Sequence, residues 1–188
     1  MIDQFKKAKS NKEILLFKNF KQSNITWDNA LQFIFDECKI ENQNLKNNKN
    51  VDSLGNVQIQ DKFWLAPQTN YLFERFPEIQ ELLYIVNGNK ENKTCNRYKT
   101  GVCNCDIVWH TQGLRMSLSP RYVSDHNDPW DILYWQVLGT SFWKMNNDVV
   151  YELNPGDLIY FSQEDSHAVW CEGPRAGFII DGIGLIDK

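Results

Sequence analysis

Two histidines and one aspartate form the most chemically suggestive group in this sequence. His126 and Asp128 are separated by one residue, so on an extended backbone both side chains point to the same face. His167 follows on a second strand-like run, after the turn signal at 154–157. Two imidazoles and one carboxylate on one side of an ion suit non-haem Fe(II), with positions open for O2 and substrate. The sequence therefore predicts a metal site made of His126, Asp128 and His167.

The composition limits the class of protein. A chain of 188 residues with 42% apolar residues fits one domain, 1–188, that buries its own core. The formal net charge of −4 argues against a polyanion-binding surface, although a local basic patch stays open, and we expect no nucleic-acid partner. No run approaches the roughly 18 apolar residues that a membrane helix needs. The start, MIDQFKKAKSNKE, lacks the apolar core of a signal peptide, so we expect a soluble cytoplasmic protein.

The first part of the chain, 1–106, predicts a few elements separated by polar loops. Residues 13–20 and 58–67 are typical of strands. Apolar spacings of three and four predict a helix that begins at Thr26 and another that begins at Pro77. The polar stretches 41–56 and 89–106 are expected to be loops, and either could act as a lid.

The second part, 107–188, changes in character. Short runs rich in β-branched and aromatic residues follow one another, separated by turn signals such as Ser119-Pro120 and Gly173-Pro174. These runs are IVWHTQ, LRMSLS, DILYWQVL, TSFWKM, DVVYEL, DLIYFS, SHAVWC and AGFIIDG. Many short strands behind N-terminal helices predict a mainly β protein, an antiparallel barrel or sandwich with helices packed on one side.

From about Leu114 to Asp181 the sequence resembles the cupin superfamily, and more closely its JmjC-like and ribosomal-oxygenase-like Fe(II)/2-oxoglutarate oxygenases. The first family motif corresponds to Ser119-Pro120, His126, Asp128, Asp131, Gln136, Gly139 and Trp143. The second corresponds to Leu153, Pro155-Gly156-Asp157, the apolar run 158–161 and His167. The resemblance implies a double-stranded β-helix, the cupin jelly roll, over 107–188. It also implies a hydroxylase that uses Fe(II), O2 and 2-oxoglutarate on a small molecule or a protein side chain.

A dicarboxylate cosubstrate needs a cation for its far carboxylate, and the planar fork of Arg suits this role. The relatives place Lys or Arg two residues after the strand's Gly, where this chain has Ser141, and Lys144 has the wrong strand parity. Arg175 resembles the Arg that other branches place shortly after the second metal His. The predicted cosubstrate residues are Arg175, Tyr134 and Gln136, with Arg115 in reserve.

Other residues near the predicted metal site have more than one interpretation. Trp130, Arg121 and Tyr122 are the candidates for the substrate pocket. Asp125 and Asp131 are either partners of the ligand imidazoles or turn carboxylates, and His110 is expected to be structural. The five cysteines are expected to be reduced, with a small zinc site at Cys95, Cys103, Cys105 and His110 as the weaker reading.

Two further functions stay open at this point. A cupin dioxygenase or isomerase would bind its substrate to the metal without 2-oxoglutarate, and Ser141 favours this alternative. A non-catalytic cupin would use the same fold to bind a small ligand or a partner, with structural histidines. An exposed sheet edge would also allow a homodimer.

Overall fold

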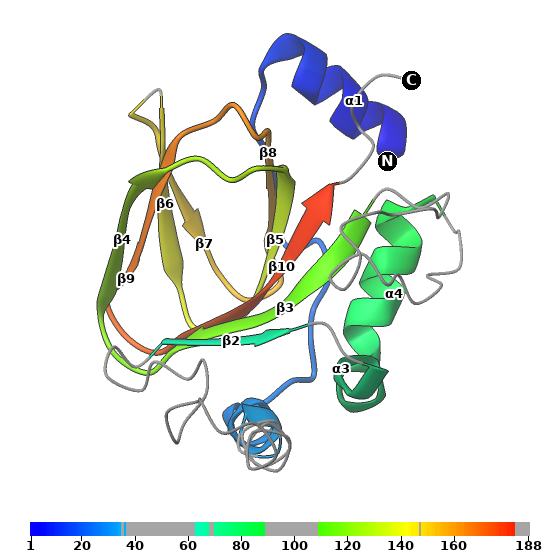
Figure 1. Ribbon diagram of the computed structural model, residues 1–188, viewed down its shortest axis with the longest axis vertical. Coiled ribbons are helices and arrows are strands. Elements are labelled where there is room, and N and C mark those ends of the chain that lie inside the picture. Colours follow the sequence, from blue (N-terminus) through cyan, green and yellow to red (C-terminus); the bar gives the residue numbers. More distant parts are fainter. Residues whose placement is uncertain (35, 37–62, 68–69, 89–108, 147, 183–188) are drawn as a thin grey trace, which may run out of the picture.

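Two antiparallel β-sheets form the centre of the computed structural model, which describes residues 1–34, 36, 63–67, 70–88, 109–146 and 148–182. The six-stranded sheet contains, in spatial order, β1 (Leu15–Phe17), β8 (Leu158–Phe161), β5 (Asp131–Leu138), β10 (Arg175–Gly182), β3 (Trp109–Ser117) and β2 (Phe63–Pro67). The four-stranded sheet contains β4 (Arg121–His126), β9 (His167–Cys171), β6 (Ser141–Met145) and β7 (Val150–Leu153). Figure 1 shows the two sheets facing each other across the barrel.

The strand order confirms the expected fold. From β3 to β10 successive strands pass from one sheet to the other, except that β6 and β7 form a hairpin within the four-stranded sheet. As a result β3 pairs with β10, β4 with β9, and β5 with β8, so that strands far apart in the chain become neighbours. This nested pairing is the double-stranded β-helix, the cupin-type jelly roll.

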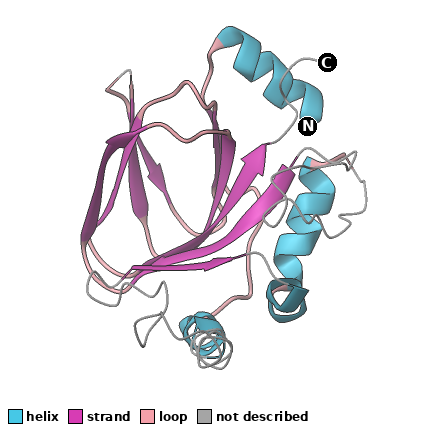
Figure 2. Cartoon of the chain, in the orientation of Figure 1, coloured by secondary structure: helices cyan, strands magenta, loops and turns pink. Residues whose placement is uncertain are grey.

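Helices cover one side of the barrel (Figure 2). They are α1 (Ile2–Asn11), a helical segment at 27–34, α3 (Asn70–Arg75) and α4 (Pro77–Val86). One hydrophobic cluster lies between these helices and the outer face of the six-stranded sheet, and it includes Phe5, Phe33, Phe76 and Phe178. A second cluster fills the barrel interior and includes Tyr134, Trp143 and Phe161. Because both faces of β5 are covered, its sequence is apolar at almost every position.

Local chemistry explains where the predicted helices begin and end. The backbone N–H of Asn29 donates to Thr26 Oγ1 at 3.2 Å, which makes Thr26 the expected N-cap. Pro77 starts α4, as its fixed φ allows in a first turn. After α4, the side chain of Asn87 donates to the carbonyl of Trp109 and accepts from its N–H, at 3.0 and 2.9 Å. The helix end is therefore fastened to the start of β3.

Several elements differ from the sequence prediction. The runs 107–112 and 114–119 were expected as two strands, but β3 is one strand with an irregularity where its register with β10 shifts near Gly113. Helices α1 and α3 were not predicted, and β4 was expected only as an extended backbone around His126. The strand expected at 13–20 is shorter, because Asn19 has a positive φ of 51° just after β1. The expected loops 41–56 and 89–106 lie outside the described residues.

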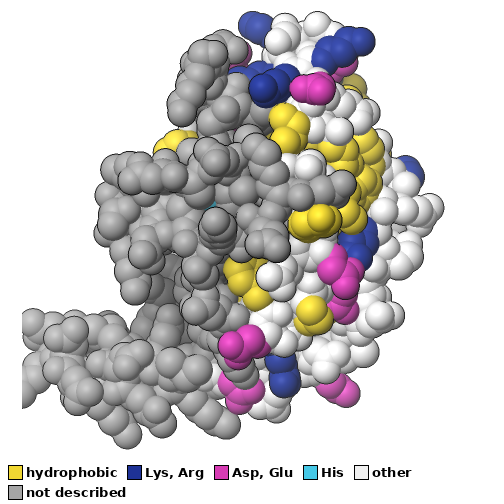
Figure 3. Space-filling view, turned by 90° about the vertical axis from the view of Figure 1, so that its right-hand side faces the viewer, with side chains coloured by type: hydrophobic (Ala, Val, Ile, Leu, Met, Phe, Trp, Pro, Cys, Tyr) yellow, Lys and Arg dark blue, Asp and Glu magenta, His cyan; other side chains and the backbone are white. Residues whose placement is uncertain are grey.

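The surface on the side of the helices carries charges of both signs. Figure 3 shows Lys and Arg side chains interspersed with Asp and Glu on this face, with hydrophobic side chains between them. Tyr84 and Ile85 of α4 are among the exposed hydrophobic residues. Within the described ranges, no helix has the length and apolar character required to cross a membrane.

The Pro155-Gly156-Asp157 turn joins the barrel to the segment that follows β1. The buried Asp157 carboxylate accepts hydrogen bonds from the N–H groups of Asn154 and Asn19, both at 2.9 Å, and from Lys18 Nζ at 2.8 Å. Burial alone would raise the pKa of Asp157, but these hydrogen bonds outweigh burial and lower the pKa below its ordinary value. The ionised carboxylate is therefore a structural component of the turn.

We predict that Asp157→Ala lowers the free energy of unfolding by about 1–3 kcal/mol at neutral pH, because two backbone donors lose their acceptor. A lowered pKa stabilises the fold above the ordinary pKa of 3.8, and this contribution is lost as the pH falls through the folded-state pKa. Urea unfolding of both proteins at about pH 7 and about pH 3 measures this. The difference should shrink in acid, and Asp148→Asn, which removes an exposed ion pair with Lys144 but suits the positive φ of 61° at this position, should change little.

Candidate metal centre

The register of two strands brings the predicted histidines together. His126 is the last residue of β4 and His167 the first of β9, and the two are direct partners in the antiparallel pair. Their ring centroids are 4.3 Å apart, and His167 Nε2 lies 3.6 Å from Asp128 Oδ2. One ligand atom from each of the three residues lies within 4.8 Å of the others. Bonds of about 2.1 Å would place neighbouring donors about 3 Å apart, so the three side chains would have to move closer together to bind one ion.

Both imidazoles are held in the tautomer that a metal ligand needs. His126 Nδ1 lies 2.8 Å from the carbonyl of Ser124, and His167 Nδ1 lies 3.3 Å from the carbonyl of Asp165. A carbonyl only accepts, so each Nδ1 carries the proton and each Nε2 presents its lone pair. Burial lowers the pKa of His167 and keeps this imidazole neutral at physiological pH.

Asp128 reaches the site in a different way from the one expected. It does not share an extended strand with His126, because β4 ends at His126 and Asp128 lies in the loop before β5. The neighbouring Asn127 donates from Nδ2 to the carbonyl of Glu164 at 3.2 Å, which ties this loop to the turn before β9. The Asp128 side chain is 17% exposed and points towards His167.

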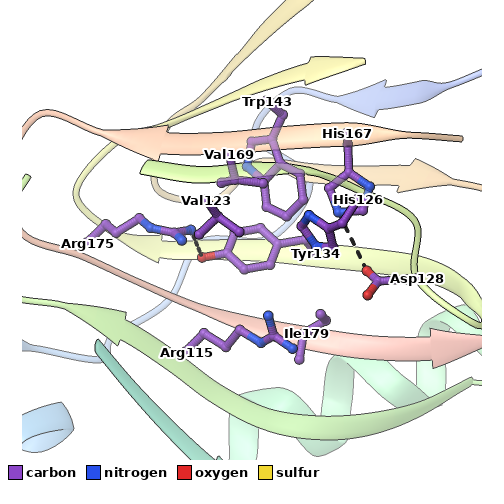
Figure 4. A pocket seen from close by; sticks show the side chains of 10 residues that line it. All are labelled: Arg115, Val123, His126, Asp128, Tyr134, Trp143, His167, Val169, Arg175 and Ile179. Carbon is purple, nitrogen blue, oxygen red and sulfur yellow. Dashed lines mark hydrogen bonds and ion pairs between the residues drawn. The ribbon is translucent and has the colours of Figure 1, made fainter. Parts of the chain in front are cut away.

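A small cavity of about 30 Å³, which opens to solvent, extends from the three ligands into the barrel. Figure 4 shows its lining, with the histidines and Asp128 at one end and Arg175 at the other, on either side of Tyr134. The lining residues are Arg115, Val123, His126, Asp128, Tyr134, Trp143, His167, Val169, Arg175 and Ile179. Both predicted arginines and Tyr134 therefore share one cavity with the metal ligands.

Arg175 is only 4% exposed. Its Nη1 donates to the hydroxyl of Tyr134 at 3.0 Å, and its Nε has no hydrogen-bond partner. Among the residues that the structure describes, no carboxylate forms an ion pair with this guanidinium. Burial raises the pKa of Tyr134, and the nearby positive charges of Arg175 and Arg115 oppose this effect. A buried, uncompensated cation of this kind is a ready binding group for an anion.

Gly177 makes the contact between Arg175 and Tyr134 possible. This residue lies two positions after Arg175 on β10, and a Cβ there would overlap the Tyr134 hydroxyl and ring and the carbonyl of Trp135. Glycine is required here by this close approach, since any side chain would displace the phenol. The phenol can therefore lie flat across β10 with its hydroxyl beside the guanidinium.

The structure does not place Gln136 in the cavity, although it shares the strand and the parity of Tyr134. Its Nε2 donates to the carbonyls of Leu138 and Gly139 at 2.6 and 3.0 Å. Ser141 Oγ donates to Gln136 Oε1 at 2.7 Å and accepts from Trp143 Nε1 at 2.9 Å. Gln136 thus braces the turn between β5 and β6, and Ser141 orients the indole that forms a cavity wall.

The expected substrate residues lie apart from the cavity lining. Arg121 and Tyr122 line a separate shallow depression with Lys144 and Trp170, and Tyr122 is 63% exposed. Trp130 is half-buried in the loop before β5 and does not line the cavity.

The remaining candidates also lie outside the cavity. Asp131 binds Lys9 Nζ at 2.9 Å and the N–H of Gln163 at 3.1 Å, so it is a structural carboxylate. Asp125 is exposed, and His110 is buried on β3 opposite Asp181. The cysteines of the alternative zinc site lie outside the described residues.

Four apolar lining residues were not proposed for the site from the sequence: Val123, Trp143, Val169 and Ile179. Trp143 was named only as the aromatic residue of the first family motif, and the other three were not singled out. Strand parity contains the signal for two of them, since Val169 is two residues after His167 and Ile179 is four after Arg175. These side chains make the walls between the metal ligands and Arg175 apolar.

Removing the hydroxyl of Ser141 should destabilise the fold. Ser141→Ala leaves Trp143 Nε1 and Gln136 Oε1 buried without partners, and we expect a loss of about 1–3 kcal/mol in the free energy of unfolding. Denaturant unfolding measures this loss. Thr140→Ala is the control, because the Thr140 hydroxyl makes an exposed hydrogen bond to Asn154. Equal effects of the two substitutions would contradict the bracing role of Ser141.

The three-ligand site predicts selective effects on metal binding. Asp128→Ala should weaken Co(II) affinity by at least about 10-fold, because one of three protein ligands is lost. Isothermal titration calorimetry with Co(II) measures the affinity directly. Asp125→Ala removes a nearby exposed carboxylate and is the matched control, with unchanged affinity expected. If both variants bind Co(II) as the parent protein does, the ion is held elsewhere.

Comparisons with known proteins find structural similarity only. No protein-family model matches the chain, and no curated protein sequence matches it. A cupin superfamily protein from Desulfitobacterium hafniense matches 44% of this chain and 72% of its own length, at 20% identity and a TM-score of 0.36. The ribosomal oxygenase YcfD from Escherichia coli, in complex with cobalt and 2-oxoglutarate, matches 38% of this chain at 19% identity and a TM-score of 0.35.

A third solved structure is a salicylate 1,2-dioxygenase variant from Pseudoaminobacter salicylatoxidans in complex with gentisate. It matches 80% of this chain at 9% identity and a TM-score of 0.46. The matched parts make up 23% of the YcfD chain and 32% of the dioxygenase chain, so this chain spans less than a third of either oxygenase. On its own strand order, the chain has the cupin-like double-stranded β-helix fold, with a His-x-Asp and His cluster inside it.

Proposed function

We propose that this protein is an Fe(II)- and 2-oxoglutarate-dependent oxygenase, acting as a hydroxylase on a small molecule or a protein side chain. The observation that carries the proposal is Arg175, a buried guanidinium at the far end of the cavity from His126, Asp128 and His167. Two features are needed for 2-oxoglutarate: a metal that one end of the molecule chelates, and a cation for the other carboxylate. The cavity offers candidates for both.

The ligand set fits Fe(II). Two neutral imidazoles and one carboxylate form the facial triad typical of non-haem iron, and they leave half of the coordination sphere for a chelating acid and O2. The hydrogen bonds from each Nδ1 to a backbone carbonyl orient both rings before the metal arrives. Bound Fe(II) and 2-oxoglutarate would supply the oxidising chemistry, with decarboxylation of the cosubstrate to succinate.

Arg175 and Tyr134 would bind the far carboxylate. The Tyr134 hydroxyl accepts from Arg175 and can donate its own proton to a carboxylate oxygen. An anion here also relieves the cost of burying an uncompensated guanidinium, so cosubstrate binding and local stability are coupled. The apolar walls made by Val123, Trp143 and Val169 keep water away from the space between the two ends.

A metal-dependent cupin enzyme without 2-oxoglutarate is the second candidate. The observation that favours it is Ser141, which stands where the relatives place their cosubstrate cation and is engaged by Gln136 and Trp143. In that case Arg175 would bind a carboxylate of the substrate itself, while the substrate binds the metal directly.

Titration of 2-oxoglutarate into anaerobic Fe(II)-loaded protein separates the two candidates. The proposal expects a weak visible charge-transfer band, and iron-dependent succinate formation once O2 is admitted. Arg175→Gln should weaken 2-oxoglutarate binding by about 10- to 100-fold, because a charged hydrogen bond contributes about 1.5–3 kcal/mol. Arg121→Gln is the control, since Arg121 lies outside the cavity lining.

Two results would contradict the proposal. If the iron-loaded protein binds the metal but gives neither band nor succinate at saturating 2-oxoglutarate, the second candidate replaces the first. If Arg175→Gln and Arg121→Gln bind 2-oxoglutarate equally well, the cosubstrate site is not at Arg175.

A further inference from the structure

A buried carboxylate outside the cavity connects the two segments that carry the metal ligands. Asp131 is the first residue of β5, three residues after Asp128, and its side chain is 1% exposed. Its Oδ1 accepts from the N–H of Gln163 at 3.1 Å, in the turn between β8 and β9. Its Oδ2 accepts from Lys9 Nζ of α1 at 2.9 Å. Asp131 is therefore the point where α1, the β4–β5 loop and the β8–β9 turn meet.

The β8–β9 turn supports the metal ligands in two ways. The carbonyl of Asp165 lies 3.3 Å from His167 Nδ1 and orients this ring. The carbonyl of Glu164 accepts from Asn127 Nδ2 at 3.2 Å, next to Asp128 in the other segment. A shift of this turn would therefore displace both the acceptor of one ligand and the loop of another.

Hydrogen bonds within the turn make it a closed unit. The Asp165 carboxylate accepts from the N–H and the hydroxyl of Ser162, both at 2.9 Å, and the N–H of Asp165 donates to the Ser162 carbonyl at 3.0 Å. Asn146 Nδ2 donates to the same carboxylate at 3.2 Å. Gln163 lies inside this closed unit, so its bond to Asp131 fixes the position of the whole turn.

Two lysines near the end of α1 reach this region, but they differ in what they contribute. Lys12 Nζ lies 3.8 Å from Glu164, and because these side chains are 81% and 67% exposed, the pair contributes little. Lys9 binds the buried carboxylate of Asp131, and a buried charge is costly unless a partner and hydrogen bonds accompany it. Figure 1 shows α1 at the end of the barrel where β8 ends and β5 begins.

We propose that Asp131 is a positioning residue of the metal centre, and that Lys9 completes this role by holding the Asp131 carboxylate. This inference rests on the metal ligands of the proposed function and not on 2-oxoglutarate. Asp131 does not line the cavity, and it acts through Gln163 and the turn that orients His167. The N-terminal helix is thereby a part of the metal centre.

Asp157 offers a matched control at the opposite end of β8. Its buried carboxylate is also bound by a lysine and by backbone N–H groups, but the turn that it holds carries no metal ligand. Asp131→Ala should weaken Co(II) affinity by about 10-fold or more, whereas Asp157→Ala should leave it within about 2-fold of the parent value. Isothermal titration calorimetry measures the affinity at a temperature where circular dichroism shows both variants to be folded.

Conservative substitutions separate positioning from general stability. Asp131→Asn keeps an oxygen that can accept from Gln163, so it should recover most of the affinity, and it also serves if Asp131→Ala does not fold. Lys9→Met should weaken Co(II) binding, while Lys6→Met, at an exposed position of the same helix, should not. The effect of Lys9→Met should disappear in the Asp131→Asn background, because an amide needs no cation.

A second measurement needs no metal. Imidazole ¹⁵N NMR of the metal-free protein at about pH 8, where histidine is neutral, reports which ring nitrogen carries the proton. His167 of the parent protein should carry it on Nδ1. Asp131→Ala should move part of the population to Nε2, and Asp157→Ala should not.

Equal Co(II) affinities in Asp131→Ala and Asp157→Ala, with the His167 signals unchanged, would overturn the inference. An equal loss of affinity in both variants would do the same, since it would reflect stability alone. Failure of the proposed function has a different signature. If the parent protein binds Co(II) but not 2-oxoglutarate, the role of Asp131 stands or falls on the same affinities. If the parent protein binds no Co(II), the NMR comparison alone decides it.

Discussion

The antiparallel pairing of β4 with β9 is the constraint on which the site depends. It sets His126 opposite His167, and the backbone carbonyls two residues before each histidine hold both rings through Nδ1. These hydrogen bonds keep the proton on Nδ1 of each ring, so Nε2 is available to a metal without a change of tautomer. The loop that carries Asp128 is tied through Asn127 to the turn before β9, so the position of the third ligand also depends on this pair of strands.

The cavity interior shows how a polar site is kept within an apolar barrel. Tyr134 and Trp143 are in ring contact, with centroids 4.7 Å apart, and each has its polar atom bonded: the phenol accepts from Arg175 and the indole donates to Ser141. Gln136 accepts from the same serine and closes the turn after β5. Loss of any one partner would leave a buried polar group without a hydrogen bond. The hydrogen bonds therefore hold the packed aromatic rings in place.

The sequence predicted the positions of most strands, but it was less successful in predicting which side chains of those strands face the cavity. Period-2 alternation and turn residues were sufficient for β5 to β10, and the resemblance suggested the pairing order. Parity failed at Gln136, because the register between β10 and β5 shifts after Ala176 and the amide bonds to nearby carbonyls instead of facing the cavity. No local pattern reveals such a shift. Asp128 lies close to His126, as expected, but the reason given for this was wrong. A loop, and not a strand shared with His126, brings Asp128 to the site.

The lining also divides by sheet. The four-stranded sheet carries both histidines and three of the apolar walls, at Val123, Trp143 and Val169, while the six-stranded sheet carries Arg115, Tyr134, Arg175 and Ile179. The two histidines and the two arginines therefore belong to separate hydrogen-bonded sheets that face each other across the barrel. A substitution at Arg175 on β10 would change the guanidinium end of the cavity without touching the β4–β9 pairing. This separation gives the fold a means to alter recognition without disturbing the metal ligands.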